Sequence, residues 1–246
     1  MDIQVEKPFE LKQKLSGYRS ELVLFKPEHS NFLFQCYQNK NFMHLYHSWG
    51  NLENLTIEEI KEKLLKEENS ILSERKKLEW VVFHKNNDCL SIPIGLIGLV
   101  SYNPVNKQAE FSAGFLQEYR KLRIGLEAVL LVLEYAFGTI KLNKLVSIVY
   151  QYNIEAQKNI IALGFLQEGL LRKHHLDTNN KFVDIYYNGL LREEFYNNQK
   201  LRRIFKRLLK RDITSSSNTA AKLRFNTPKA LQFKNFLQQI YNDHNT

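Results

Sequence analysis

Residues 109–137 read AEFSAGFLQEYRKLRIGLEAVLLVLEYAF, and this stretch decides the fold. It begins as a β candidate, and residues 125–137 then repeat apolar side chains at helical spacing, at positions 126, 129, 130, 133 and 137. A strand, a short loop and a helix are therefore expected in direct succession. The N-terminus of such a helix presents unpaired amides and the positive end of its dipole. With Arg120, Lys121 and Arg123 around it, the loop is a candidate site for an anion such as pyrophosphate, and an ordinary solvated loop is the alternative.

Strand and helix candidates follow one another on both sides of this stretch. The β candidates lie at 21–25, 79–85, 92–102, 107–116, 145–151, 165–174 and 181–188. Helices are expected over 27–39, after an N-cap at Thr56, and over 154–162, where Gly164 is a natural C-cap. This order predicts a mixed α/β (α+β) body.

Composition favours a folded protein of the cytoplasm. Of 246 residues, 43% are hydrophobic, which is typical of a globular chain. The sequence has no apolar run long enough to span a membrane, and its N-terminus lacks the pattern of a secretory signal. The two cysteines, Cys36 and Cys89, have no metal-like spacing and are expected to be buried thiols in a reducing compartment.

The net charge of +9 is concentrated at the C-terminal end of the chain. Residues 200–246 hold 11 Lys and Arg but only 2 Asp and Glu, which leaves 24 basic and 24 acidic residues before them. A basic tail on a neutral body indicates an appendage with its own anionic partner. We therefore expect a body over 1–198 and a basic helical tail with a Ser/Thr-rich linker over 199–246.

Three motifs in the body resemble the GNAT N-acetyltransferases, and most closely the branch that includes the ribosomal-protein N-terminal acetyltransferases. The acetyl-CoA-binding segment of that branch is matched by Ala109, Glu110, Glu118, Tyr119, Arg120, Gly125, Glu127 and Ala128. Its Asn-x-x-Ala/Ser helix that ends in Gly-Phe is matched by Asn153, Ala156, Gly164 and Phe165. Its closing pattern is matched by Asp184, Tyr187, Gly189, Leu190, Leu191, Glu194 and Phe195. The resemblance implies a GNAT-like mixed, mostly antiparallel central sheet flanked by helices, followed here by the helical tail.

The chain departs from the family motif in the loop that meets the phosphates. Arg123 stands where the family has its middle glycine, and Lys121 replaces a glycine common in this branch. Ser112 replaces a frequent glycine of the preceding strand. Arginine keeps the backbone amide available only if its φ and ψ are permitted, and it adds a cation beside the phosphates or blocks them.

The resemblance also implies the chemistry: a primary amine attacks the thioester of acetyl-CoA directly, with acetyl-CoA as co-substrate and no metal. The resemblance implies that Glu110 is the general base that deprotonates the amine, and the alternative is that Glu110 is an ordinary strand carboxylate. It leaves Tyr187 or water as the general acid that protonates the departing thiolate. The residues expected to contact acetyl-CoA are Phe115, Leu116, Arg120, Lys121, Arg123, Ile124, Gly125, Leu126 and Asn153. Asn153 is equally a helix N-cap. Tyr46, His47 and Trp49 are expected to touch the acceptor, which is a protein N-terminus, an amino sugar or another small amine, and simple packing is the alternative for them.

The first part of the tail is an amphipathic basic helix. Over 199–212 apolar side chains fall at 201, 204, 205, 208 and 209, and cations fill the other face. The stripe either packs on the body or binds an anionic membrane, RNA or an acidic protein, with a peripheral membrane position following from the lipid case. A second class of function remains open, a catalytically weak GNAT-like binding module docked through this tail. The sequence does not indicate an oligomeric state.

Overall fold

The computed structural model describes residues 11–46, 52–70, 75–85, 91–120, 122–177 and 180–212. The strands are β1 (Lys14–Ser16), β2 (Ser20–Leu24), β3 (Leu78–Lys85), β4 (Ser91–Asn103), β5 (Gln108–Phe115), β6 (Lys144–Tyr150), β7 (Leu166–Leu176) and β8 (Phe182–Leu191). The helices are α1 (Ser30–Gln38), α2 (Lys40–Met43), α3 (Ile57–Glu68), α4 (Arg123–Glu134), α5 (Ile154–Ala162), α6 (Arg192–Asn197) and α7 (Gln199–Leu209). Within these ranges every helix is too short or too polar to span a membrane.

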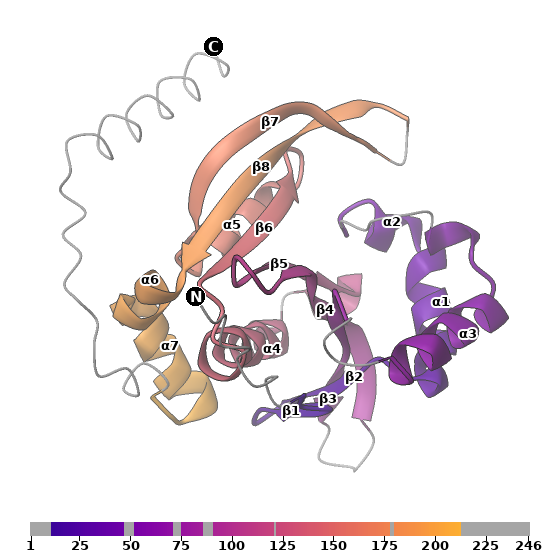
Figure 1. Cartoon of the computed structure of the whole chain (residues 1–246), viewed down its shortest axis with the longest axis horizontal. Coiled ribbons are helices and arrows are strands. Elements are labelled where there is room, and N and C mark those ends of the chain that lie inside the picture. Colours follow the sequence, from indigo (N-terminus) through magenta and orange to yellow (C-terminus); the bar gives the residue numbers. More distant parts are fainter. Residues whose placement is uncertain are drawn as a thin grey trace, which may run out of the picture.

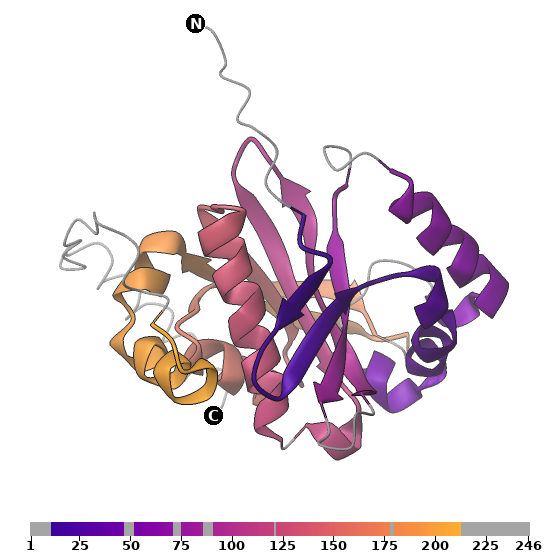
Figure 2. The ribbon, with the colours of Figure 1, turned by 90° about the horizontal axis from the view of Figure 1, so that it is seen from below.

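The strands form one eight-stranded sheet in the order β1-β2-β3-β4-β5-β6-β8-β7. Neighbouring strands run antiparallel except β5 and β6, which run parallel. Figure 2 shows α1 to α3 on one side of the sheet and α4 on the other. The mixed, mostly antiparallel sheet flanked by helices is thus confirmed. The short edge strand β1 is an addition that periodicity did not reveal, because three residues are too few to show alternation.

Two apolar cores lie on the two faces of the sheet. The larger core joins the sheet to α4 and also takes Ile160 of α5 and Phe205 of α7. The smaller core joins the sheet to α1 and α3 and contains Cys36, whose thiol pKa is raised to about 12 by burial. The buried thiol expected at Cys36 is therefore confirmed, and Cys89 lies outside the described residues.

Local sequence signals explain where the helices begin and end. The Thr56 side chain caps α3 by accepting from the amide of Glu59, whose carboxylate accepts from the Thr56 amide in return. After α5 the chain reverses at Gly164 with φ of +98°, a left-handed value that favours glycine. Both predicted helix boundaries are confirmed.

Helix α4 is fixed to the first hairpin by the buried carboxylate of Glu127. Its Oε1 accepts from the amides of Arg19 and Ser20, at 2.8 and 3.0 Å, and from the Ser20 hydroxyl at 2.9 Å. A Cβ at Gly17 would lie 2.1 Å from the same oxygen, so this turn needs a residue without a side chain. The β1–β2 turn therefore sets the position of α4 against the sheet.

Helix α7 packs its apolar stripe on the body, as the packing account of the tail predicts. Leu201 and Phe205 are both fully buried, and Phe205 meets Phe195 edge to face at 5.9 Å. Asn198 caps the helix by accepting from the amides of Lys200 and Leu201. Figure 1 shows α6 and α7 beside α4. The boundary expected at 198 thus falls between α6 and α7, which both pack into the larger apolar core. The rest of the tail, 213–246, lies outside the described residues.

We expect Phe205→Ala to lower the free energy of unfolding by about 3–5 kcal/mol, because it empties a fully buried aromatic site. Urea denaturation of the full chain would measure this change. Arg207→Ala is the matched control on the exposed face of α7 and should stay within about 0.5 kcal/mol of the parent. Equal stability of the two variants would mean that α7 does not pack on the body.

Candidate active site

The central feature of the sheet is that β5 and β6 part soon after they meet. Their parallel pairing comprises only Gln108 with Lys144, Ala109 with Leu145, and Glu110 with Val146. Beyond this point β5 continues to Phe115 and β6 to Tyr150, each without the other. A cavity of about 650 Å³ opens between them, lined also by residues of α2, α4 and α5. Paired backbone groups face each other in a closed sheet, so a split of this kind leaves a slot into which an extended ligand can fit.

Helix α4 begins beside this cavity with its N-terminus uncapped. Leu122 occupies the cap position, and no side chain of the described residues accepts from the first amides. Arg123 is the first helical residue, its side chain is exposed, and its φ is not among the positive values of the described residues. A glycine is therefore not required at this position by the backbone. The amides and the helix dipole together form a ready site for an anion.

Arg120 braces the loop between β5 and α4. Its Nε donates to the carbonyl of Phe115 at 3.0 Å, and a terminal nitrogen donates to the carbonyl of Asn41 at 3.4 Å. The side chain thus ties the end of β5 to α2 while it lines the cavity. The contact with Asn41 joins segments 79 residues apart, so no local spacing in the sequence indicates it.

Only some of the residues that were expected to contact acetyl-CoA line the cavity. Phe115, Arg120 and Asn153 line the cavity. Gly125 lies behind the Phe115 ring, which a Cβ at this position would meet at 3.3 Å. Ile124, Leu126 and Leu116 do not line it, for different reasons. Ile124 is buried in the main core, Leu126 packs beside it, and the Leu116 amide donates to the Ile94 carbonyl. Lys121 lies outside the described residues.

Asn153 connects α5 to the segment that covers the cavity. Its Oδ1 accepts from the amide of Ala156 at 3.2 Å, which confirms the predicted N-cap. Its Nδ2 donates to the carbonyl of Leu45 at 3.4 Å. One side chain therefore both caps α5 and holds the turn after α2 beside the cavity, which Leu45 lines.

Glu110 sits at the point where the two strands separate. It is only 6% exposed, so it is not an ordinary surface carboxylate. Successive strand side chains point to opposite faces, and Ser112, two residues on, lies 3.5 Å from the Tyr46 hydroxyl of the α2 segment. Glu110 therefore faces the side of α1 to α3. Burial raises the pKa of Tyr46, and the charge of Glu79 and, to a smaller extent, that of Glu110 raise it further.

The expected substrate residues are only partly described. Tyr46 is buried and lines the cavity. His47 and Trp49 lie outside the described residues. Tyr187 of β8 is half-buried and does not line the cavity, although its cross-strand partner Ile148 does. Since Asn188 bonds Gln157 of α5 on one face, alternation turns Tyr187 to the opposite face, which Glu110 shares.

A stack of aromatic rings borders the cavity, and sequence reasoning missed it. His44 and Tyr152 are parallel at 4.4 Å, Tyr152 and Tyr150 at 5.1 Å, and Tyr150 meets His175 at 5.2 Å. The Tyr152 hydroxyl also donates to the His44 carbonyl at 2.7 Å. Burial, with the charge of Asp177, raises the pKa of Tyr152 to about 12. These rings come from three distant segments, so no local spacing indicates that they meet.

Known proteins share both the sequence pattern and this architecture. Residues 19–166 match the sequence model of the Acetyltransferase (GNAT) domain family. The uncharacterized N-acetyltransferase YoaA of Bacillus subtilis (strain 168) is 22% identical over 142 residues, which cover 58% of this chain and 76% of that protein.

Solved structures agree in fold. The spermidine N-acetyltransferase of Vibrio cholerae, in complex with CoA and spermine, superposes with a TM-score of 0.64 at 21% identity, covering 73% of this chain and 99% of that one. A mutant of the spermidine N-acetyltransferase from the same organism gives a TM-score of 0.60 at 21% identity, over 72% of this chain and 97% of that one. With a family match that spans more than half of its length, the chain belongs to the GNAT acetyltransferases and is an acetyl-CoA-dependent N-acetyltransferase.

Proposed function

We propose that acetyl-CoA lies in the slot between β5 and β6, with its pyrophosphate over residues 120–126. The observation that carries this proposal is the juxtaposition of the slot and the uncapped α4 N-terminus. The amides at Arg123 to Gly125 point where an anion is best stabilised, and the exposed Arg123 side chain adds a cation beside them. Phe115 and Asn153 then contact the pantetheine arm, because both line the slot.

Glu110 is the proposed base. An ammonium must lose a proton before its nitrogen can attack the thioester, and a carboxylate near the attacked carbon can take that proton directly or through one water. Glu110 lies where the strands part, which is where an acyl group at the end of the slot would stop. It shares its side of the sheet with Tyr46, so an acceptor that enters from the α1–α3 side reaches both.

The hydroxyl groups divide between two roles. Burial keeps the pKa of Tyr46 far above that of a thiol, so this hydroxyl stays protonated and serves as a hydrogen-bond donor to the acyl oxygen. It is a poor proton source for a departing thiolate for the same reason. The proposed proton donor is water or Tyr187, which is half-buried on β8 with β6 between it and the strand of Glu110.

For the acceptor we propose a small aliphatic amine with a second positive charge, such as a polyamine. A cationic substrate is favoured where aromatic rings and carboxylates gather, and the stack that contains Tyr150 and Tyr152 lies near the charges of Glu110 and Asp177. The polyamine named with the Vibrio cholerae neighbour supports this class. A protein N-terminus is the second candidate, favoured by the motif resemblance to the ribosomal-protein branch.

We expect acetyl-CoA to bind the parent protein in calorimetric titration and Gly125→Val to weaken that binding at least about tenfold. The added side chain meets the Phe115 ring, which must shift into the slot. Gly169→Val is the control, because a Cβ at Gly169 has no neighbour within 4 Å. If the parent protein gives no heat with millimolar acetyl-CoA, the proposed site is refuted. If the two variants bind acetyl-CoA equally well, Phe115 is not part of the binding site.

Glu110→Gln should lower kcat by about 100-fold and leave the acetyl-CoA affinity nearly intact, because it removes only the proton acceptor. The acidic limb of the pH–rate profile should disappear with it. Glu62→Gln, which changes an exposed carboxylate of α3 in the same way, is the control and should keep the parent rate. An unchanged kcat in Glu110→Gln would return this carboxylate to a purely structural role.

Acceptors can be compared by following CoA release with a thiol reagent. Spermidine and spermine should exceed peptides with N-terminal Ala or Ser, and amino sugars, by at least about tenfold in kcat/KM, because rings and carboxylates at the site favour an acceptor with a second positive charge. Faster turnover of the peptides would instead support the ribosomal-protein type of acceptor. Turnover of neither class, with acetyl-CoA still bound, would contradict both.

A further inference from the structure

Helix α7 has a buried apolar face and an exposed cationic face. The apolar face is occupied, because Leu201 and Phe205 are fully buried and Ile204, Leu208 and Leu209 pack against the main core. A helix that lies on a membrane must insert such a face into the lipid boundary. This face of α7 is no longer free to do so, which removes the main argument for lipid.

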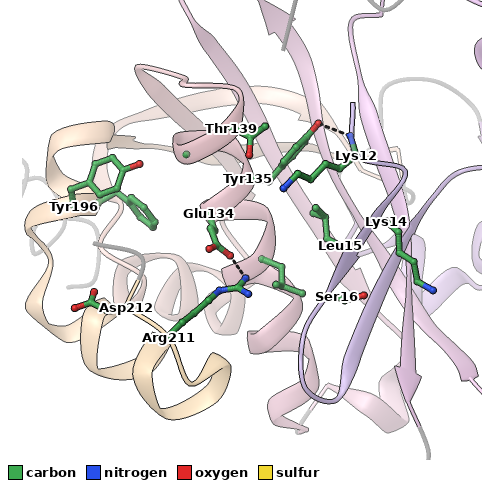
Figure 3. Close-up of a pocket in the computed structure, with 13 residues that line it drawn as sticks. Lys12, Lys14, Leu15, Ser16, Glu134, Tyr135, Thr139, Tyr196, Arg211 and Asp212 are labelled. Carbon is green, nitrogen blue, oxygen red and sulfur yellow. Dashed lines mark hydrogen bonds and ion pairs between the residues drawn. The ribbon is translucent and has the colours of Figure 1, made fainter. Parts of the chain in front are cut away.

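The opposite face carries cations, and some of these are already neutralised. Asp212 pairs with Arg202 at 2.7 Å and with Lys206 at 3.5 Å. Figure 3 shows Arg211 paired with Glu134 of α4, and both line a cavity of about 460 Å³ between α4, β1 and the end of the tail segment. The pairs of Asp212 fold the end of the tail segment back on α7, and the pair of Arg211 with Glu134 anchors it to the body.

Four cations are left with no counter-charge among the residues that the structure describes, and we call them the basic stripe: Lys200, Arg203, Arg207 and Lys210. All four side chains are exposed. At 3.6 residues per turn Lys200, Arg203 and Arg207 fall within an arc of about 60° and extend over about 10 Å of the helix. Lys210 follows as the left-handed C-cap residue, so the four exposed cations run along α7 and its C-terminal end.

The N-terminal part of the basic stripe works against the stability of the helix that carries it, whereas Arg207 lies in the last turn, where the helix dipole favours a cation. Like charges three and four residues apart repel, and Lys200 stands in the first turn, where the helix dipole disfavours a cation. No acidic residue occupies that turn to offset it. An arrangement that opposes the helix in this way is typical of a surface that meets a polyanion.

We propose that the basic stripe binds the sugar-phosphate backbone of double-stranded RNA. Protein interfaces need apolar or aromatic anchors at their centre, and the exposed face of α7 offers none, whereas backbone binding needs only cations in a row. The groove of B-DNA is deep and takes a helix that stands free, but α7 is embedded along one side in the body. The shallow minor groove of A-form RNA presents its backbone to a surface of this kind.

Fluorescence anisotropy of the full chain with a labelled RNA duplex of about 20 base pairs tests the proposal. The first variant replaces Lys200, Arg203, Arg207 and Lys210 by Gln. The charge-matched control replaces four exposed lysines elsewhere, Lys61, Lys63, Lys66 and Lys181, by Gln. The basic-stripe variant should bind at least about tenfold more weakly, and its log K against log salt slope should be shallower by about 3. The control should keep most of the affinity and slope.

Three results would overturn the proposal. The first is equal loss in the two variants, which would mean that only net charge matters. The second is equal or tighter binding of a DNA duplex of the same sequence. The third is tighter retention on vesicles of phosphatidylcholine with about one third phosphatidylserine than on RNA. The heat of acetyl-CoA binding and the rate of acetyl transfer should be unchanged in the basic-stripe variant, which would show that its fold is intact. A loss of RNA binding in this variant would then come from the basic stripe.

Discussion

The single constraint on which this structure depends is the early separation of β5 and β6. The only parallel pairing in the described sheet comprises three residue pairs of β5 and β6. After Glu110 and Val146 the two strands are no longer paired with each other. A sheet split in this manner leaves backbone groups and side chains facing an open slot, which a ligand must satisfy. The slot lies beside the loop that leads into α4, and α5 lines it.

The elements around the slot are held by polar contacts made from outside it. Glu127 locks α4 to the β1–β2 turn, and Arg211 pairs with the other end of the same helix. On the far side, the amides of Asn188 and Gln157 bond each other in both directions, at 2.8 and 3.0 Å, and Asn188 also donates to the Ser147 carbonyl. These hydrogen bonds hold α5 against β6 and β8 on this side of the slot, in addition to apolar packing.

Sequence reasoning succeeded where one local rule decides the outcome. The strand-loop-helix order over 109–137, the cap at Thr56 and the reversal at Gly164 each follow from periodicity or from one residue type. It failed where distant segments meet, as with the ring stack of His44 and Tyr152. It also left the tail open, because a helix that packs on a body and a helix that binds lipid show the same amphipathic stripe, and only the burial of Phe205 separates them.

The substitution of the motif glycine by Arg123 shows how such a departure is tolerated. Glycine is required by the backbone where φ is positive, and Arg123 opens α4 with an ordinary helical φ. The demand for a small residue falls instead on Gly125, which is pressed against the Phe115 ring inside the first turn. The chain therefore has glycine at position 125, where packing against Phe115 requires it. At position 123, where the packing does not require glycine, it has an arginine. In a loop whose proposed guest is a pyrophosphate, that exchange raises the positive potential at the mouth of the slot without altering the backbone that forms it.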